Sequence, residues 1–274
     1  MDRSGSIIYF GTENNMKSCL GLEAILKDGW NVQMVIAYKP PPQKSQPRSI
    51  LYRTKHFFSS IVKLHPRIDH LVRRVLKKTK NYGEFSSLEE LSRMTNTHFS
   101  LTKNKSLQGF KDEIVNISPD IILSNGWMFK IGEDIFSIAR LIALNCHSSY
   151  LPEYRGGNVT YAPLINEEKE SGVTVHQLVE KFDAGAILAQ RRVPIQRGET
   201  PSSLNVKRAL ITGSVLIEAL EIAGHEELYK PNPPTPFYFR CDYATYKRYK
   251  RINFLRKLVA LPIKRYEPKE RYDI

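Results

Sequence analysis

Residues 6–38 read SIIYFGTENNMKSCLGLEAILKDGWNVQMVIAY, and this stretch decides the class of fold. The apolar run at 6–11 ends in glycine and predicts a buried strand at the start of a parallel sheet. Turn and cap residues follow at 12–15, and apolar side chains then recur at helical spacing as far as Gly29. Another apolar run at 31–38 predicts a second strand. Because strand, helix and strand in this order close as a right-handed parallel crossover, the sequence predicts an α/β protein.

The same alternation continues along the chain. Apolar and capping patterns predict helices at 86–94, 110–117 and 202–223, and strands at 120–123, 141–146, 172–177 and 186–195. We therefore predict a doubly wound, mostly parallel sheet with a small C-terminal appendage. Residues 1–205 would form the first domain, with a basic insertion at 41–80, and residues 206–274 a helix and a basic segment of weak periodicity.

The composition is typical of a soluble globular protein, and the length is sufficient for an enzyme. Apolar residues make up 41% and charged residues 25% of 274 residues, which is enough for a sizeable core. No run approaches the roughly 20 apolar residues of a membrane-spanning helix, and the start lacks a signal-peptide layout, so we expect a cytoplasmic protein. Cys19, Cys146 and Cys241 are odd in number and widely spaced, which indicates reduced thiols and neither a disulfide framework nor a metal site.

The net charge of +13 is concentrated in two segments. Residues 41–80 carry 11 Lys and Arg against one acid, residues 237–274 carry 11 against four, and the remaining chain sums to −4. The pattern at 56–80 predicts one or two basic amphipathic helices, which could lie on an anionic membrane or bind nucleic acid. A solvated charged face or a dimer contact is the alternative interpretation of both segments.

The chemically informative stretch is 145–157, which reads NCHSSYLPEYRGG. It lies just beyond a predicted buried strand, where open parallel sheets place their ligands. Asn145 and His147 are two residues apart, so both side chains project to one side of an extended segment and Cys146 to the other. Asp183 begins an Asp-Ala-Gly turn between two predicted strands, and this turn can direct its carboxylate into the same crevice.

Three motifs in this order resemble a known enzyme family. They are N-x-H-x-S-x-L-P-x-x-R-G at 145–156, S-G-V-T at 171–174 and D-x-G-x-I at 183–187, with weaker similarity in F-G-T at 10–12 and P-D-I-I at 119–122. The chain resembles the folate-dependent formyltransferases, which include glycinamide ribonucleotide transformylase, methionyl-tRNA formyltransferase and the sugar-nucleotide N-formyltransferases. The resemblance spans residues 7 to about 200 and implies a Rossmann-like core over the first domain, with N10-formyltetrahydrofolate as formyl donor.

The resemblance also assigns the candidate catalytic set. Formyl transfer to an amine needs a deprotonated nucleophile, stabilisation of an oxyanion and a proton for the departing nitrogen. Asn145 would donate its amide to the oxyanion, and His147 would hold that charge or accept the amine proton. Asp183 would orient His147 or a bridging water and relay the proton. We interpret His176, which lies in the next strand, as structural.

Folate binding is likewise implied by the resemblance. The pterin ring would lie in an apolar slot. The segment that follows the strand at 120–123 would line one side of this slot, and the loop that precedes Asp183 would line the other. The residues concerned are Gly126, Trp127, Met128, Phe129, Ile131, Glu180, Lys181 and Phe182. Trp127 and Met128 could equally be core residues. The family often has a second acid and a glycine just before the aspartate, where this chain has Glu-Lys-Phe.

The amine acceptor is less well indicated. Glu13 follows the first strand and would repel the phosphate that purine-pathway relatives hold there. Sugar-nucleotide relatives share Ser-Tyr-Leu-Pro and short C-terminal segments, so we expect a nucleotide-linked amino sugar used in bacterial surface polysaccharide (lipopolysaccharide O-antigen), contacted by Tyr150, Tyr154, Arg155 and Gly156. A surface turn is the alternative for Arg155.

Two other functions stay open at this point. A methionyl-tRNA formyltransferase-like enzyme is one, supported by the basic tail, although little room is left for a tRNA-binding domain, and nucleic acid is the less favoured partner. A non-catalytic protein that binds an anionic membrane or nucleic acid on the same scaffold is the other. We expect the C-terminal appendage to serve homodimer formation or acceptor binding.

Overall fold

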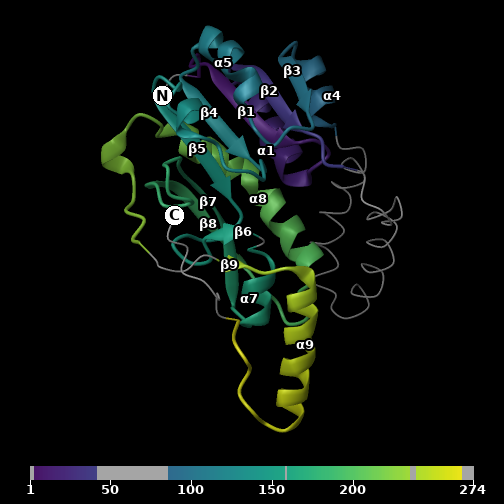
Figure 1. Cartoon of the computed structure of the whole chain (residues 1–274). Helices are drawn as coiled ribbons and strands as arrows, with labels where there is room; N and C mark the ends of the chain where they lie inside the picture. The colour runs from purple at the N-terminus through teal and green to yellow at the C-terminus, as the bar shows by residue number, and fades with distance from the viewer. Residues whose placement is uncertain (1–2, 42–85, 158, 235–238, 267–274) are drawn as a thin grey trace.

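The computed structural model describes residues 3–41, 86–157, 159–234 and 239–266. The predicted helices at 56–80, and almost all of the basic insertion, lie outside the described residues. The chain forms a seven-stranded sheet in the order β3-β2-β1-β4-β5-β7-β8 (Figure 1). Its strands are β1 (Ile7–Thr12), β2 (Val32–Tyr38), β3 (His98–Thr102), β4 (Ile121–Asn125), β5 (Ile142–His147), β7 (Glu170–Gln177) and β8 (Ile187–Pro194). The first five of these in the sheet are parallel, and β7 and β8 are antiparallel to their neighbours.

Helices cover both faces of this sheet. On one face, β1 and β5 contribute Tyr9 and Leu144 to a core shared with α1 (Met16–Lys27), α4 (Leu88–Met94) and α8 (Pro201–Glu221). On the other face, Ile8 and Ala143 pack with residues of α5 (Lys111–Ile117) and α6 (Glu133–Phe136). Since side chains alternate across a strand, one apolar run supplies both cores. The predicted doubly wound, mostly parallel sheet is confirmed.

Side-chain caps begin the two helices that flank the site. Asn15 accepts hydrogen bonds from the backbone N–H groups of Lys17 and Ser18, at 3.1 and 3.2 Å, and so starts α1 directly after β1. Thr200 and Ser203 form a reciprocal capping box at the start of α8. Helix α8 packs along α1. The boundary predicted between residues 205 and 206 falls inside α8, and the division into two domains stays a prediction.

The edge strand β3 was not predicted from the sequence. Its side chains are mostly half-buried or exposed, so His98–Thr102 lacks the apolar run that marks the central strands. The short 3₁₀ segments Gln108–Phe110 and Glu226–Leu228 complete the elements of the main body. None of the helices formed by the described residues is long and apolar enough to cross a membrane.

The C-terminal segment is more regular than its weak periodicity predicted. Strand β6 (Gly156–Gly157), which precedes α7 (Tyr161–Ile165), forms a two-stranded parallel pair with β9 (Phe239–Arg240). Helix α9 (Tyr243–Leu258) then begins at Asp242, whose carboxylate accepts the N–H of Thr245 at 2.7 Å. It packs on α7 at one end and extends away from the body at the other (Figure 1).

Candidate active site

The polar site is built by the pairing of β5 with β7. In this antiparallel register Asn145 lies opposite His176, and His147 lies opposite Thr174. Cys146 faces the other way, into the core beneath α1 and α8, as the sequence predicts. Directly opposed side chains of an antiparallel pair are close neighbours. The Asn145 Nδ2 and His176 Nε2 atoms are accordingly 3.2 Å apart.

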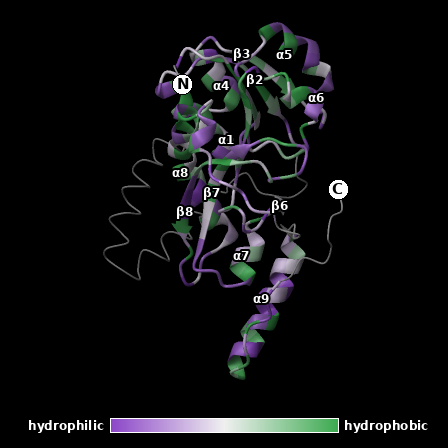
Figure 2. Ribbon diagram, turned by 90° about the vertical axis from the view of Figure 1, so that its left-hand side faces the viewer, coloured by the Kyte–Doolittle hydropathy of each residue, from purple (hydrophilic) through white to green (hydrophobic). Residues whose placement is uncertain are grey.

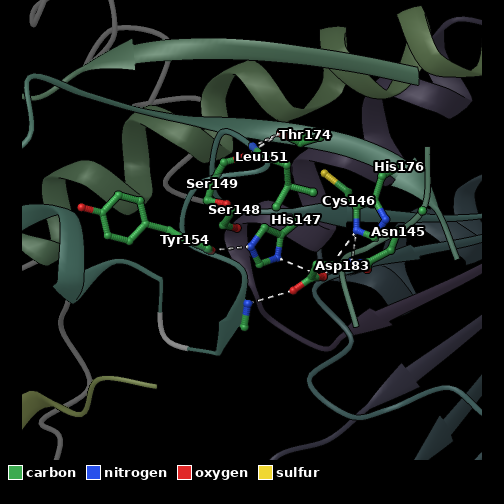
Figure 3. Close-up of polar contacts among 12 residues, drawn as sticks. Asn145, Cys146, His147, Ser148, Ser149, Leu151, Tyr154, Thr174, His176 and Asp183 are labelled. Carbon is green, nitrogen blue, oxygen red and sulfur yellow. Dashed lines mark hydrogen bonds and ion pairs between the residues drawn. The ribbon is translucent and has the colours of Figure 1, made fainter. Parts of the chain in front are cut away.

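Asp183 joins this group from the loop between β7 and β8. Its Oδ1 atom lies 3.5 Å from His147 Nδ1 and 3.4 Å from His176 Nε2. Its Oδ2 atom accepts the backbone N–H of Gly156 at 2.9 Å. Figure 3 shows the amide, both imidazoles and the carboxylate gathered together. The fold therefore brings Asp183 next to Asn145 and His147, although it lies more than 30 residues further along the chain.

Hydrogen bonding to carbonyl groups fixes one nitrogen of each imidazole. His147 Nε2 lies 3.1 Å from the Tyr154 carbonyl oxygen, which only accepts, so Nε2 carries a proton. Neutral His147 therefore presents an unprotonated Nδ1 toward Asp183. His176 Nδ1 likewise donates to the Gln177 carbonyl at 2.8 Å. Its Nε2 atom accepts from Asn145 when the ring is neutral and donates to Asp183 when the ring is protonated.

Burial and neighbouring charges leave His147 neutral and Asp183 ionised. Burial lowers the pKa of His147 below its ordinary value, although the Asp183 carboxylate opposes this effect. Burial works to raise the pKa of Asp183, but the His147 and His176 imidazoles and the Gly156 N–H together hold that pKa well below its usual range. At neutral pH the site thus contains an ionised carboxylate beside an imidazole that can accept a proton.

Two cations that the sequence analysis did not single out lie beside this site. The Lys17 ammonium, from the first turn of α1, donates to the Cys146 carbonyl. The fully buried Arg208 guanidinium, from α8, donates to the Ser148 carbonyl and to Thr160 Oγ1, the latter at 2.6 Å. They hold the carbonyl groups on either side of His147. Burial lowers the pKa of Arg208 to about 9, so this guanidinium stays charged at neutral pH.

His176 also has a place that the sequence interpretation missed. We interpreted it as structural, yet its Nε2 atom contacts both Asn145 and Asp183. In the sequence, the contact of His176 with the site was indicated only by its position in the strand after the motif. This position becomes informative when the register of β5 and β7 is known.

The structure gives Arg155 a different role from the predicted acceptor contact. Arg155 is 0% exposed, and its guanidinium donates to the Asn232 side chain and to the Pro233 carbonyl, the latter at 2.9 Å. Asn232 in turn donates to the carbonyl groups of Asp183 and Gly185, at 3.0 and 2.8 Å. Arg155 and Asn232, named the turn clamp below, therefore hold the Asp183 turn from behind. The sequence carried no signal for Asn232, because it lies in a proline-rich connector.

The two tyrosines predicted to bind the acceptor make contacts within the protein instead. The Tyr154 hydroxyl donates to Glu168 at 2.6 Å and accepts from Asn166 at 3.0 Å, and its ring points away from His147 (Figure 3). Tyr154 contacts His147 through its backbone carbonyl oxygen and not through its ring. The Tyr150 ring stacks with the Arg192 guanidinium at 3.7 Å. Gly156 contacts Asp183 through its backbone N–H.

The two segments predicted to bind folate meet next to the polar site. The Lys130 ammonium lies 5.6 Å from the ring centroid of Phe182 and so links them. Met128 is 61% exposed and Phe182 is 38% exposed, while Glu180 and Lys181 are exposed around them. Trp127 and Ile131 instead belong to the buried core, where Trp127 packs against Phe10 and Tyr38. Phe129 borders that core and Gly126 turns the chain at a φ of 84°.

Gly185 allows the Asp183 turn to lie close to β7. A Cβ atom at this position would be 2.1 Å from the Gln177 carbonyl oxygen, which is backbone and cannot move aside. We expect Gly185→Ala to lower the free energy of unfolding by about 1–3 kcal/mol, through overpacking, and to lower activity at temperatures where the variant is folded. Gly109→Ala is the control, since its Cβ would meet nothing within 4 Å. Thermal unfolding of the two variants checks this, and equal stability would contradict it.

No group of three or more metal-binding side chains is placed to hold a metal ion among the residues that the structure describes. The polar site consists of an amide, two imidazoles and a carboxylate, flanked by two cations and by exposed apolar side chains.

Comparison with known proteins relates this site to a family and to several relatives. The formyl transferase family matches residues 7–220. Methionyl-tRNA formyltransferase of Enterococcus faecalis is 36% identical over 109 residues, 40% of this chain and 35% of that protein. The bifunctional polymyxin resistance protein ArnA of Wigglesworthia glossinidia brevipalpis is 31% identical over 162 residues, 59% of this chain and 25% of that protein. This chain thus spans about a third or less of the length of these relatives.

Solved structures share the fold at low sequence identity. Glycinamide ribonucleotide transformylase 1 of Symbiobacterium toebii matches with a TM-score of 0.55 and 16% identity, over 81% of this chain and 88% of its own. HypX of Aquifex aeolicus, solved in complex with tetrahydrofolic acid, matches with a TM-score of 0.51 and 16% identity, over 85% of this chain and 29% of its own. Since the family match covers most of the chain and contains the whole polar site, the resemblance seen in the motifs is confirmed, and the protein belongs to the formyl transferase family of folate-dependent enzymes.

Proposed function

We propose that this protein is an N-formyltransferase that moves the formyl group of N10-formyltetrahydrofolate to the primary amine of a nucleotide-linked amino sugar. The observation that carries the proposal is the contact of Asp183 with His147 and His176, with Asn145 beside them. Membership of the formyl transferase family supports the reaction class. The free thiols of all three cysteines fit the cytoplasmic location predicted from the sequence.

The residues divide the reaction between them. When bound, formyltetrahydrofolate supplies a formyl carbon that first gains the bond to the acceptor nitrogen and then loses its bond to N10. The unprotonated Nδ1 of His147 takes the proton of the attacking amine, and the Asp183 carboxylate stabilises the resulting imidazolium. Neutral His176 holds one N–H of Asn145, which leaves the second N–H for the negative charge that develops on the formyl oxygen. The proton then passes from His147 to the departing nitrogen.

The described residues fit a folate. Met128 and Phe182 expose apolar surface beside the buried carboxylate, and the Lys130 contact holds their two segments together. A flat pterin ring needs such an apolar slot with few polar contacts. We assign the slot to these two side chains and to the backbone around them, while Trp127 and Ile131 support it from the core. HypX, a protein of the same fold solved with tetrahydrofolic acid, supports the choice of donor.

The acceptor proposal rests on the sequence resemblance and on Glu13. Glu13 is buried beside the start of α4, and burial raises the pKa of its carboxyl group. A carboxylate there disfavours a bare phosphate on the loop after β1. Transfer to methionyl-tRNA is the second candidate, favoured by the similarity to the Enterococcus faecalis enzyme and by the basic face of α9.

Mass spectrometry distinguishes these acceptors. The protein would be incubated with formyltetrahydrofolate and, separately, with thymidine-, uridine- and guanosine-diphosphate-linked amino sugars or with methionyl-tRNA. Our proposal expects one amino sugar to gain about 28 mass units, the difference between a formyl group and the hydrogen it replaces. Formylation of methionyl-tRNA alone would select the second candidate, and absence of any formylated product would remove the proposed activity.

The acid limb of the pH profile tests His147 as the base. Since burial lowers its pKa, and the basic form must be present, kcat/KM is expected to fall at low pH with a midpoint below about 6.5. The Lys17 charge contributes to this lowering. Lys17→Met should therefore move the midpoint to higher pH. Rates measured from pH 5 to 9 check the prediction, and an unchanged midpoint in this variant would contradict the assignment.

A further inference from the structure

Helix α9 carries two kinds of exposed side chain in separate places. At its far end and in the turn that follows it lie five exposed apolar residues, named the α9 tip below: Phe254, Leu255, Leu258, Val259 and Leu261, with exposures of 63, 53, 68, 64 and 49%. Nearer the body, four of the exposed positions are basic: Lys247, Arg248, Lys250 and Arg251. Figure 2 shows α9 as a projecting element with mixed hydrophobic and hydrophilic segments.

Packing does not explain the α9 tip. The side of α9 that faces the body is occupied by Tyr246 and Asn253, and Asn253 exchanges hydrogen bonds with Lys264 and donates to the Ile165 carbonyl. This fixes which side of the helix is turned outward. Isolated exposed apolar residues are normal on a protein surface, whereas five in one short segment mark an interaction surface.

The charged residues of α9 indicate which kind of partner covers the α9 tip. No acid occurs in α9, and its basic residues near the tip are partnered, with Lys257 paired to Glu167 at 2.5 Å and Arg256 bonded to the Pro262 carbonyl at 2.6 Å. Within the part of the chain that the structure describes, the four basic residues nearer the body pair with no acid, and Lys247 and Lys250 lie over the rings of Tyr243 and Tyr246. Positive charge beside exposed apolar side chains fits an anionic lipid surface.

The spacing of the two groups matches the layers of a bilayer interface. A helix rises 1.5 Å per residue, so the centre of the basic group lies about 10 Å from the α9 tip along the axis. Amphipathic segments bury their apolar groups roughly 5–10 Å into the boundary between headgroups and acyl chains. A second copy of this chain would bring two basic helices together, and a nucleic acid would leave the aliphatic side chains exposed to water.

We propose that the α9 tip inserts into the surface of a membrane that contains anionic phospholipid, with Lys247, Arg248, Lys250 and Arg251 at the headgroups. The inference rests on α9 and on none of the residues of the polar site. It places a membrane contact on α9, whereas the contact predicted from the sequence at 56–80 lies outside the described residues.

Flotation of the whole protein with vesicles tests this. Vesicles of phosphatidylcholine alone are compared with vesicles containing about 30% phosphatidylserine. We expect binding only to the anionic vesicles, a loss of at least tenfold in Leu255→Glu/Leu258→Glu, and a comparable, salt-dependent loss in Lys247→Glu/Arg248→Glu. Met94→Glu and Leu228→Glu are controls at exposed apolar positions elsewhere, 71 and 52% exposed, and should bind as the parent does.

Other outcomes would overturn the proposal. Absence of binding to anionic vesicles, or equal binding by the tip variant, would show that the α9 tip does not meet lipid. A dimer that sedimentation detects in the parent and not in the tip variant would assign the surface to a second copy. Because the substituted side chains are exposed and lie away from the polar site, circular dichroism and formyl transfer in solution should be unchanged in the tip variant.

Discussion

Asp183→Asn is expected to lower kcat by about 10²–10⁴-fold, the largest effect of any substitution considered for this protein. The neutral amide can still accept the Gly156 N–H, but it cannot stabilise a protonated His147. Since the Asp183 charge opposes the lowering of the His147 pKa, its removal should also move the acid limb of the pH profile to lower pH. Steady-state rates between pH 5 and 9 measure both effects.

The fold must be controlled in this experiment. The folded-state pKa of Asp183 lies below its ordinary value, so its charge stabilises the fold above the unfolded pKa, and that contribution is lost as pH falls through the folded pKa. Asp183→Asn should therefore also reduce Tm at neutral pH, and rates should be compared below that transition. Asp120→Asn is a matched control, because Asp120 bonds Ser6 and Arg140 far from the polar group. Equal losses of kcat in both variants would contradict the role of Asp183.

Asn232→Asp is expected to lower kcat by about 10–100-fold, although residue 232 touches neither imidazole. The substitution keeps a partner for Arg155 but removes the N–H groups that hold the Asp183 and Gly185 carbonyls. Asp183 has a φ of 49°, which non-glycine residues rarely adopt, so its turn depends on such contacts. Displacement of a reacting group by about 1 Å is enough for a loss of this size.

The pH profile separates positioning from simple destabilisation. The carboxylate introduced at 232 pairs with the Arg155 guanidinium, which offsets its charge. If the turn clamp keeps Asp183 beside His147, Asn232→Asp should therefore move the acid limb to lower pH, as Asp183→Asn does. Asn253→Ala is the control, since Asn253 is buried with three hydrogen bonds in the α9 region and none to the polar site. A variant at 232 with reduced Tm but an unmoved acid limb would show a purely structural role for Asn232.

Local patterns were sufficient for much of the fold. The apolar runs that became β1, β2, β4, β5, β7 and β8 are buried strands, and such runs are recognisable without knowledge of their neighbours. Strand β3 was missed because its edge position leaves it half-exposed. Helix α9 was not predicted, because its aliphatic side chains gather at its exposed end and do not line a buried face. The apolar periodicity of a packed helix is therefore absent.

The α/β class, the family and the candidates Asn145, His147 and Asp183 could be predicted before the fold was known, because they depend on short motifs whose order is visible along the chain. Three contacts became known from the folded chain alone: His176 faces Asn145, Arg155 is buried against Asn232, and Lys17 and Arg208 hold the strand end at His147. The physical reason is that each of these contacts depends on strand register or on chain crossings between distant segments. A shift of one residue in the pairing of β5 and β7 would turn His176 to the opposite face of the sheet.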